Sequence, residues 1–204
     1  MVQVYLSPAA GVFPSSIAAS VFSLVGLLWI LSEIVGAGII PRIRRRGTRI
    51  KKEDRGSHLL LWMSIFASII IAYSLAGSGI AMLPSWVYYP GIVLMVSGIV
   101  LRQWSIAVLG QFFSGTVGIQ GGQKVVDTGP YRLVRHPSYT GLLLILVGLG
   151  LAVQSGWAVL VLLLLFGMAI GYRMYVEEQA LVSELGDEYV KYSKSTKRLI
   201  PYVL

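Results

Sequence analysis

A short polar stretch of the chain, Asp127–Gly141, carries residue types that can bind a charged ligand. It holds two prolines, two glycines, two tyrosines, a histidine and two arginines, and it lies between strongly apolar segments. Pro137 suits the first turn of a helix, because that turn does not use the N–H group that proline lacks. Arg135 and His136 would then stand at the positive end of the helix, where the free amides after Pro137 can meet a carboxylate. The stretch predicts a site for a zwitterionic cofactor.

A second group of charged residues lies near the end of the last apolar run. A helix places Arg173 and Glu177 on one face, about 6 Å apart, with Glu178 one position further round. Taken alone, such a pair is a surface ion pair worth about a few tenths of a kcal/mol, and a lone histidine such as His136 is a helix-start residue satisfied by a carbonyl. Taken together, the two groups predict a divided site, in which Glu177 answers a cation on a cofactor and Arg173 holds an anionic acceptor.

Glycine is dense in the segment that joins these features to the preceding apolar run. Glycine lets the backbone approach a ligand closely and expose its amide donors, and six glycines occur here: Gly110, Gly115, Gly118, Gly121, Gly122 and Gly129. Gln120, Gln123 and Lys124 add side-chain donors. The sequence has neither a dinucleotide-binding G-x-G-x-x-G after a strand nor a P-loop, so this is either another kind of ligand loop or a simple connector.

The composition identifies the surroundings of these residues. The chain has 204 residues, of which 55% are hydrophobic and 13% charged, and its mean hydropathy is +0.74. These values are typical of an integral membrane protein. Because cysteine is absent and there are only two histidines, we expect no disulfide and no metal site. No Lys or Arg precedes Arg42, so we expect the first apolar run to be a retained helix rather than a cleaved signal peptide.

The apolar runs predict an all-α fold, a polytopic membrane helical bundle with five transmembrane segments. They are Ser16–Ile40, Leu59–Gly77, Trp86–Leu109, Tyr139–Val153 and Trp157–Tyr175. The fourth run would extend only about 22 Å as a helix, against a hydrocarbon core of about 30 Å, so the last two runs should form a helical hairpin turning at Gln154–Gly156. We expect residues 1–110 to be an N-terminal unit of three membrane helices and residues 111–204 to be the catalytic part, with a cytoplasmic cofactor loop and a C-terminal helix.

The basic residues predict the orientation of the bundle. If the segment after the first run faces the cytoplasm, all 17 Lys and Arg residues fall on that side. The opposite loops, Met1–Ser15, Ser78–Ser85 and Gln154–Gly156, contain none, as the positive-inside rule requires. The N-terminus is therefore expected outside, and the active site and C-terminus on the cytoplasmic side. The net charge of +8 then indicates affinity for anionic lipid headgroups and not for nucleic acid.

Two features fall within the apolar runs. Glu33 lies about 13 Å inward from Arg42 along the first helix, so it must be protonated, exposed by snorkelling, or paired, and Arg102 is a candidate partner. The alternative is that Glu33 lies on a substrate path. The spacing Gly167-x-x-x-Gly171 is typical of helices that pack closely.

The C-terminal residues repeat apolar positions at helical spacing. Leu181, Leu185, Tyr189 and Tyr192 predict an amphipathic segment that packs in the core, lies on the membrane, or closes over the site. Ile200-Pro201 ends this segment, and we expect it to dock under the cofactor loop.

The polar motifs follow one another in an order that resembles a known family. They are Gly129-Pro130-Tyr131, Arg135–Gly141, Glu177-Glu178, Gly186–Tyr189 with Tyr192, and Arg198–Pro201. This series is similar to the C-terminal signature of the isoprenylcysteine carboxyl methyltransferases and their phospholipid-methyltransferase-like relatives. The first two apolar runs carry no such signature. Proteins of this family are membrane enzymes that transfer a methyl group from S-adenosylmethionine at the cytosolic face, without a Rossmann domain.

Carried over residue by residue, the resemblance implies a set of site residues. The implied cofactor contacts are Gln120, Gln123, Lys124, Val125, Val126, Tyr131, His136, Pro137, Ser138, Tyr139, Glu177 and Glu178. Arg173 and Glu177 take catalytic roles, and Arg173 faces the substrate. Glu33 lies outside the resemblance and is a further substrate candidate only because of its place in the first helix. Two departures concern the acceptor: Gln123 replaces a histidine of the family, and the acidic run after the last span is cut to two residues.

The resemblance implies an S-adenosylmethionine-dependent methyltransferase acting on the carboxylate of a lipid-tailed acceptor, such as a C-terminal isoprenylcysteine. A carboxylate is already ionised at pH 7, so positioning and exclusion of water would supply most of the rate. An amine acceptor such as phosphatidylethanolamine would need a base, for which Glu177, Glu178 and His136 are candidates. A third alternative is a non-methylating, reductase-like relative. The expected partners are the lipid-modified substrate and the bilayer, with no nucleic acid and no metal.

Overall fold

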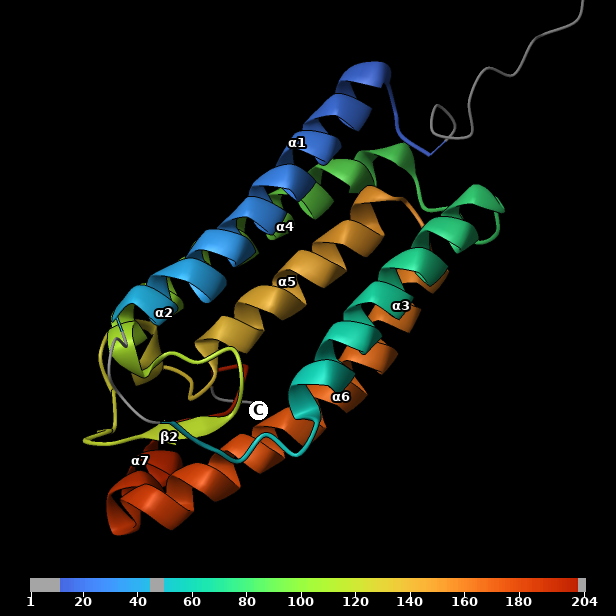
Figure 1. The fold of residues 1–204 in the computed structure, drawn as a ribbon. Helices are drawn as coiled ribbons and strands as arrows, with labels where there is room; N and C mark the ends of the chain where they lie inside the picture. The colour runs from blue at the N-terminus through green and yellow to red at the C-terminus, as the bar shows by residue number, and fades with distance from the viewer. Residues whose placement is uncertain (1–11, 45–49, 202–204) are drawn as a thin grey trace, which may run out of the picture.

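Long apolar helices dominate the computed structural model, which describes residues 12–44 and 50–201 (Figure 1). Four helical segments of this described part are long and apolar enough to cross a membrane: Ser16–Ile39, Ser57–Gly77, Ser85–Phe112 and Gly156–Leu185. The protein is therefore an integral membrane protein. The fourth predicted run forms α5 (Pro137–Ala152), whose 16 residues extend about 24 Å at 1.5 Å per residue. The five predicted segments are all helical, but a fifth complete span is not confirmed.

The helical segments are built from several elements. They are α1 (Ser16–Ser32), the π-helix η2 (Glu33–Ile39), α2 (Ile40–Arg44), α3 (Ser57–Gly77), η3 (Ser85–Val87), α4 (Tyr88–Leu109), η4 (Gly110–Phe112), η5 (Gly129–Arg132), α5, α6 (Gly156–Leu185) and α7 (Asp187–Ser195). A small antiparallel ribbon pairs β1 (Ile50–Lys52) with β2 (Gly118–Gln120). We did not predict this ribbon, because strands of three residues show no alternation that a sequence can reveal.

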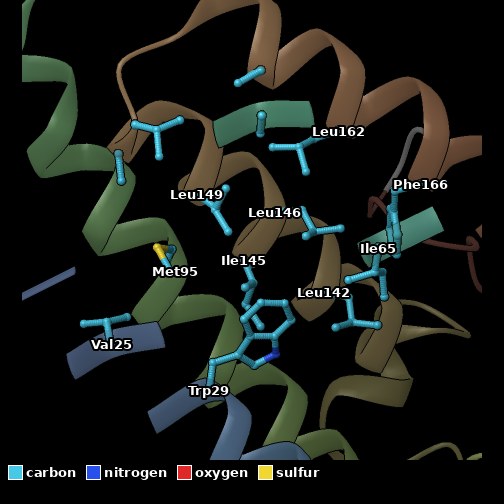
Figure 2. Close-up of a cluster of buried hydrophobic side chains, with 14 of the residues drawn as sticks. Val25, Trp29, Ile65, Met95, Leu142, Ile145, Leu146, Leu149, Leu162 and Phe166 are labelled. Atoms are coloured by element: carbon cyan, nitrogen blue, oxygen red, sulfur yellow. The ribbon is translucent and has the colours of Figure 1, made fainter. Parts of the chain in front are cut away.

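The short helix α5 lies at the centre of the bundle. It packs against α4 on one side and α6 on the other, and α3 packs against α6. The fully buried side chains around it include Met95 of α4, Ile145 and Leu146 of α5, and Leu162 and Phe166 of α6 (Figure 2). Since lipid surrounds the outer helices, tight packing and not exclusion of water must hold these apolar faces together.

The backbones of α4 and α5 approach each other at two pairs of glycines. A Cβ atom added at Gly98 would lie 2.5 Å from the carbonyl oxygen of Gly141, and one added at Gly148 would lie 2.5 Å from the carbonyl oxygen of Gly91. No side chain fits at such distances. The close approach of α4 and α5 therefore depends on these glycines.

The predicted packing motif Gly167-x-x-x-Gly171 does not serve this purpose within the chain. Both glycines are exposed, and an added Cβ at either would meet no described atom within 4 Å. The face of α6 that packs inward carries Phe166 and Ile170 instead. The prediction was wrong because α6 is apolar on all sides, so spacing alone did not reveal which side faces its neighbours.

The two ends of the bundle differ. At one end the turn between α5 and α6 meets the loop between α3 and α4, where the amide of Leu83 donates to the carbonyl of Gln154 at 2.7 Å. At the other end α6 continues past the predicted limit at Tyr175 to Leu185, and α7 folds back beside it. The polar motifs of the sequence all lie at this second end, as the predicted hairpin requires.

The glycine contacts predict unequal effects of the same substitution. Gly98→Ala should destabilise the protein by about 1–3 kcal/mol, because the new methyl group forces α4 away from α5. Gly171→Ala, the matched control in an exposed helical position, should be neutral or stabilising by up to about 1 kcal/mol. Thermal unfolding in detergent micelles measures both. Equal melting temperatures for the two variants would contradict the close packing of α4 and α5.

Candidate active site

A cavity of about 390 Å³ opens at this second end, between the bundle and the glycine-rich loop. Eleven of the predicted site residues line it: Glu33, Gln123, Lys124, Val125, Val126, Tyr131, His136, Ser138, Tyr139, Arg173 and Glu177. Other lining residues come from α3, including His58, Leu61 and Trp62. The cavity therefore draws on both halves of the chain.

Three predicted cofactor residues are not part of this lining. Pro137 is fully buried where it begins α5, so its role in the structure is to start the helix. The carboxylate of Glu178 is turned to neighbouring cations. Gln120 belongs to β2, and its side chain lies outside what the structure describes.

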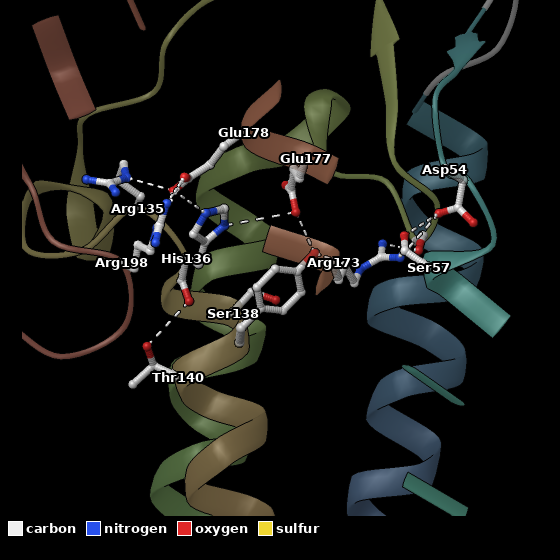
Figure 3. A network of polar contacts seen from close by, with 12 residues as sticks. Asp54, Ser57, Arg135, His136, Ser138, Thr140, Arg173, Glu177, Glu178 and Arg198 are labelled. Carbon is white, nitrogen blue, oxygen red and sulfur yellow. Dashed lines mark hydrogen bonds and ion pairs between the residues drawn. The ribbon is translucent and has the colours of Figure 1, made fainter. Parts of the chain in front are cut away.

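Arg173 is the most enclosed charged residue of the site, with 2% of its surface exposed. Its Nε donates to the hydroxyl of Tyr139 at 2.8 Å, and its Nη2 donates to the carbonyl of Gly115 at 2.6 Å. Its Nη1 donates to Asp54 at 3.3 Å and to Ser57 at 3.2 Å (Figure 3). Four of the five N–H groups of the guanidinium are thus used.

Glu177 reaches Arg173 through a third residue. The hydroxyl of Tyr139 accepts from Arg173 and donates to Glu177 at 2.6 Å. The Glu177 side chain is 30% exposed, and its carboxylate lies 3.9 Å from Nδ1 of His136. The expected helix-face arrangement of Arg173 and Glu177 is present, with a tyrosine between the two charges.

His136 is held by acids and by an aromatic ring. Its Nε2 lies 3.2 Å from Glu178, and its ring stacks on Tyr139 with centroids 5.4 Å apart. The amides of Tyr139 and Thr140 donate to the His136 carbonyl at 2.9 and 3.1 Å. Those two amides are therefore occupied, and the prediction that they would be free to meet a ligand carboxylate was wrong: the first turn of α5 satisfies them itself.

Glu178 fastens the C-terminal segment to the start of α5. It accepts from Arg135 at 3.0 Å and from Arg198 at 2.7 Å. Two further hydrogen bonds join the same segments. The amide of His136 donates to the carbonyl of Arg198 at 3.0 Å, and the side-chain hydroxyl of Thr140 donates to the carbonyl of Leu199 at 2.7 Å. The segment leading to Ile200-Pro201 thus runs beside the His136 turn.

The C-terminal apolar positions lie beside the cavity. Leu181, Leu185, Tyr189 and Tyr192 all line it, and Tyr189 is also buried, so the segment fits both packing in the core and closure over the site. Burial raises the pKa of Tyr192 to about 12 and raises that of Tyr131 further. Both phenols are therefore neutral at physiological pH, and the charge of the cavity comes from its acids, its arginines and Lys124.

Glu33 forms the predicted pair with Arg102. Arg102 Nη2 donates to Glu33 at 2.7 Å, its Nε donates to the other carboxylate oxygen, and its Nη1 donates to the Ser138 hydroxyl at 2.7 Å. Both charged side chains are less than one tenth exposed. The pairing is confirmed, and it ties the π-helix η2 through α4 to the start of α5.

Two polar residues of this network were missed from the sequence. Asp54 and Ser57 precede and begin α3, and both contact Arg173. Burial raises the pKa of Asp54, but hydrogen bonds from the Val117 and His58 amides and the Ser57 hydroxyl, together with the Arg173 charge, outweigh this effect. The net pKa of Asp54 therefore lies below its usual value. An acid just before an apolar helix resembles a simple helix cap, so the sequence offered no sign of a distant partner.

A family model described as phospholipid methyltransferase matches residues 86–188, just over half of the chain. The chain belongs to the phospholipid methyltransferase family. The matched region runs from η3 to α7 and includes most of the cavity lining.

Several curated proteins are similar to the chain over part of its length. A probable protein-S-isoprenylcysteine O-methyltransferase of Oryza sativa subsp. indica is 28% identical over 120 residues, covering 58% of this chain and 63% of the relative. A protein-S-isoprenylcysteine O-methyltransferase of Schizosaccharomyces pombe is 31% identical over 105 residues, covering 50% of this chain and 44% of the relative. The chain thus spans less than two thirds of the length of these relatives.

One solved structure shares the fold of this chain. The eukaryotic intramembrane Ras methyltransferase, an isoprenylcysteine carboxyl methyltransferase, aligns with a TM-score of 0.62 at 21% identity, covering 98% of this chain and 70% of that one. The similarity includes the first two membrane helices, which the family model does not match.

The buried pair of Glu33 and Arg102 predicts a loss of stability that is larger when one partner is removed than when both are replaced. Glu33→Ala should cost about 3–5 kcal/mol, because it leaves the Arg102 charge buried without its partner. Glu33→Ala combined with Arg102→Met should recover part of that loss. Thermal unfolding in micelles measures both. A double variant less stable than the single one would show that the charges do not depend on each other.

Proposed function

We propose that the protein is an S-adenosylmethionine-dependent methyltransferase that methylates the carboxylate of a lipid-tailed acceptor, such as a C-terminal isoprenylcysteine, to form a methyl ester. The observation that carries this proposal is the placing of Glu177 and Arg173 in one cavity, joined by the Tyr139 hydroxyl. An anion and a cation side by side can bind a cationic donor and an anionic acceptor at once. The names of the relatives support the same reaction.

Glu177 is the carboxylate that suits a cationic ligand. Among the described residues, no Lys or Arg side chain lies within ion-pair distance of it, whereas Glu33, Asp54 and Glu178 each have an arginine partner. A partly exposed acid in a cavity at the membrane boundary favours a cation that neutralises it. The amino or sulfonium group of the methyl donor has this charge.

The remaining lining fits such a donor. The cavity volume lies within the range of about 300–1,000 Å³ that is usual for small-molecule sites. The rings of Tyr131, Tyr139 and Tyr189 offer aromatic surface for a nucleoside base or a cation. Gln123 and Lys124 supply donors from the loop. When bound, S-adenosylmethionine supplies an electrophilic methyl group on a sulfonium.

Arg173 is suited to hold the acceptor carboxylate. One N–H of its Nη2 stays unused after the contacts to Tyr139, Gly115, Asp54 and Ser57, and Arg173 lines the cavity. The acceptor carboxylate is ionised at neutral pH, so no residue has to remove a proton. The contribution of the chain is to hold the reactants in line and to keep water out.

The apolar part of the lining suits a lipid tail. Leu61, Trp62 and Ile65 come from α3, a candidate membrane span, and Pro41 lies in α2, directly after the span Ser16–Ile39. A lipid-tailed acceptor can therefore enter sideways between helices, while the polar donor enters from the aqueous side. We place this side in the cytoplasm, with the N-terminus outside, because the basic residues gather at this end.

The proposal predicts a base-labile product. Purified protein in lipid, given radiolabelled methyl donor and a panel of farnesylcysteine analogues and phospholipids, should label the prenylated carboxylate, and mild base should release the label as methanol. Base-stable methylamines on phospholipids would instead show an amine-directed enzyme. Absence of transfer to every acceptor, together with no binding of S-adenosylhomocysteine, would favour a non-methylating relative.

The role of Glu177 predicts a change in donor binding. Glu177→Gln should weaken binding of S-adenosylmethionine by roughly tenfold or more, since one charge-assisted hydrogen bond contributes about 1.5–3 kcal/mol. Isothermal titration calorimetry measures this change. The control is Glu184→Gln, which alters an exposed acid two turns further along α6 and outside the cavity lining. Equal affinities for the Glu177 variant and the control would contradict the assignment.

A further inference from the structure

We infer that Asp54 is a positioning residue for methyl transfer, which holds the Arg173 guanidinium and the glycine-rich loop in one geometry and keeps Arg173 away from Glu177. The inference rests on the proposed function. Asp54 precedes α3 and lies outside residues 86–188, the region that the family model matches. It touches none of the reacting groups in the proposal and acts through Arg173.

The Asp54 carboxylate accepts hydrogen bonds from three parts of the fold. Oδ1 accepts from the Val117 amide at 3.0 Å, from the Ser57 hydroxyl at 3.1 Å and from Arg173 at 3.3 Å. Oδ2 accepts from the His58 amide at 3.1 Å. One side chain thus joins the start of α3, the glycine-rich loop and α6 (Figure 3).

The same loop is held a second time beside Asp54. The carbonyl of Gly115 accepts from Arg173 and lies 2.7 Å from Nδ1 of His58, and the amide of Glu53 donates to the carbonyl of Val117 at 3.0 Å. From Val117 the chain continues through β2 to the loop residues Gln123–Val126 that line the cavity. A displacement of Asp54 would therefore move Arg173 and the loop residues Gln123–Val126 together.

The charge of Asp54 also determines whether Arg173 pairs with Asp54 or with Glu177. Among the described side chains, Asp54 is the carboxylate within ion-pair distance of Arg173, and a buried guanidinium needs such a partner. Without Asp54 the next carboxylate is Glu177, already linked to Arg173 through the Tyr139 hydroxyl. Rotation of Arg173 toward Glu177 would neutralise Glu177, the acid that is proposed to bind the cationic methyl donor.

The contact of Asp54 with Arg173 leaves the arginine able to bind an acceptor. At 3.3 Å it is longer than the contacts of Arg173 with Tyr139 and Gly115, at 2.8 and 2.6 Å. The neutral acceptors thus hold Nε and Nη2, while Asp54 holds Nη1 with Ser57, and the single carboxylate contact balances the charge of the guanidinium only in part.

The test is a double-mutant cycle between Asp54 and Arg173 in the lipid-reconstituted full chain. Asp54→Ala should lower kcat/KM for the prenylated acceptor by about tenfold to a hundredfold, since small misplacements of reacting groups cost up to about a hundredfold. In an Arg173→Lys background the same change should add less than about threefold, because the two residues act as one unit. The control Glu184→Ala removes an exposed acid of α6 and should leave the kinetics unchanged.

Two further variants guard against misfolding. Asp54→Asn keeps the shape and removes the charge, and it should reproduce most of the loss in kcat/KM with a smaller fall in melting temperature than Asp54→Ala, because a hydrogen-bonding side chain remains in place. Ser57→Ala removes a neutral contact to the same Nη1 and should have a smaller effect. Additive losses in the cycle, or unchanged kcat/KM in both Asp54 variants, would overturn the inference. A wild-type protein that transfers no methyl group would refute the proposed function instead, and the two failures are distinct.

Discussion

The buried guanidinium of Arg173 is the group on which the arrangement of the site depends. It lies where α6 leaves the apolar layer, and its donors draw together the start of α3, the glycine-rich loop and the first turn of α5. A cation with 2% exposure is stable only when its hydrogen bonds are satisfied and its charge is countered. A shift of one of the elements that supply those acceptors would therefore disturb the contacts of the others with Arg173.

The other buried charges follow the same rule. Arg102 pairs with Glu33, and Arg135 pairs with Glu178, so each of these arginines ties a membrane helix or the C-terminal segment to the start of α5. This pairing leaves Glu177 as the acid facing the cavity without an arginine partner among the described residues. Glu178, which forms structural ion pairs, and Glu177, the candidate binding residue, are therefore neighbours on α6. Their positions alone do not distinguish their roles.

The small size of α5 makes this concentration of contacts possible. Its glycines let it lie directly against α4, and its first turn carries Ser138 and Tyr139 into the polar layer. A longer or bulkier helix would separate Arg102 from Ser138 and Tyr139 from Arg173. Packing inside the membrane thus sets the geometry of the polar site at its boundary.

The sequence by itself determined the membrane character, the apolar helices, Arg102 as a candidate partner of Glu33, and the two polar groups predicted to form one site. These features are local, because they depend on hydropathy, on helical spacing and on the conformational preferences of proline. Only the tertiary structure decided which glycines pack, that Glu178 turns away from the cavity, and that Asp54 contacts Arg173 from a distant part of the chain. The reason is physical: a helix that is apolar on all sides shows no preferred face, and a hydrogen bond between residues far apart in the chain leaves no periodic trace in the sequence.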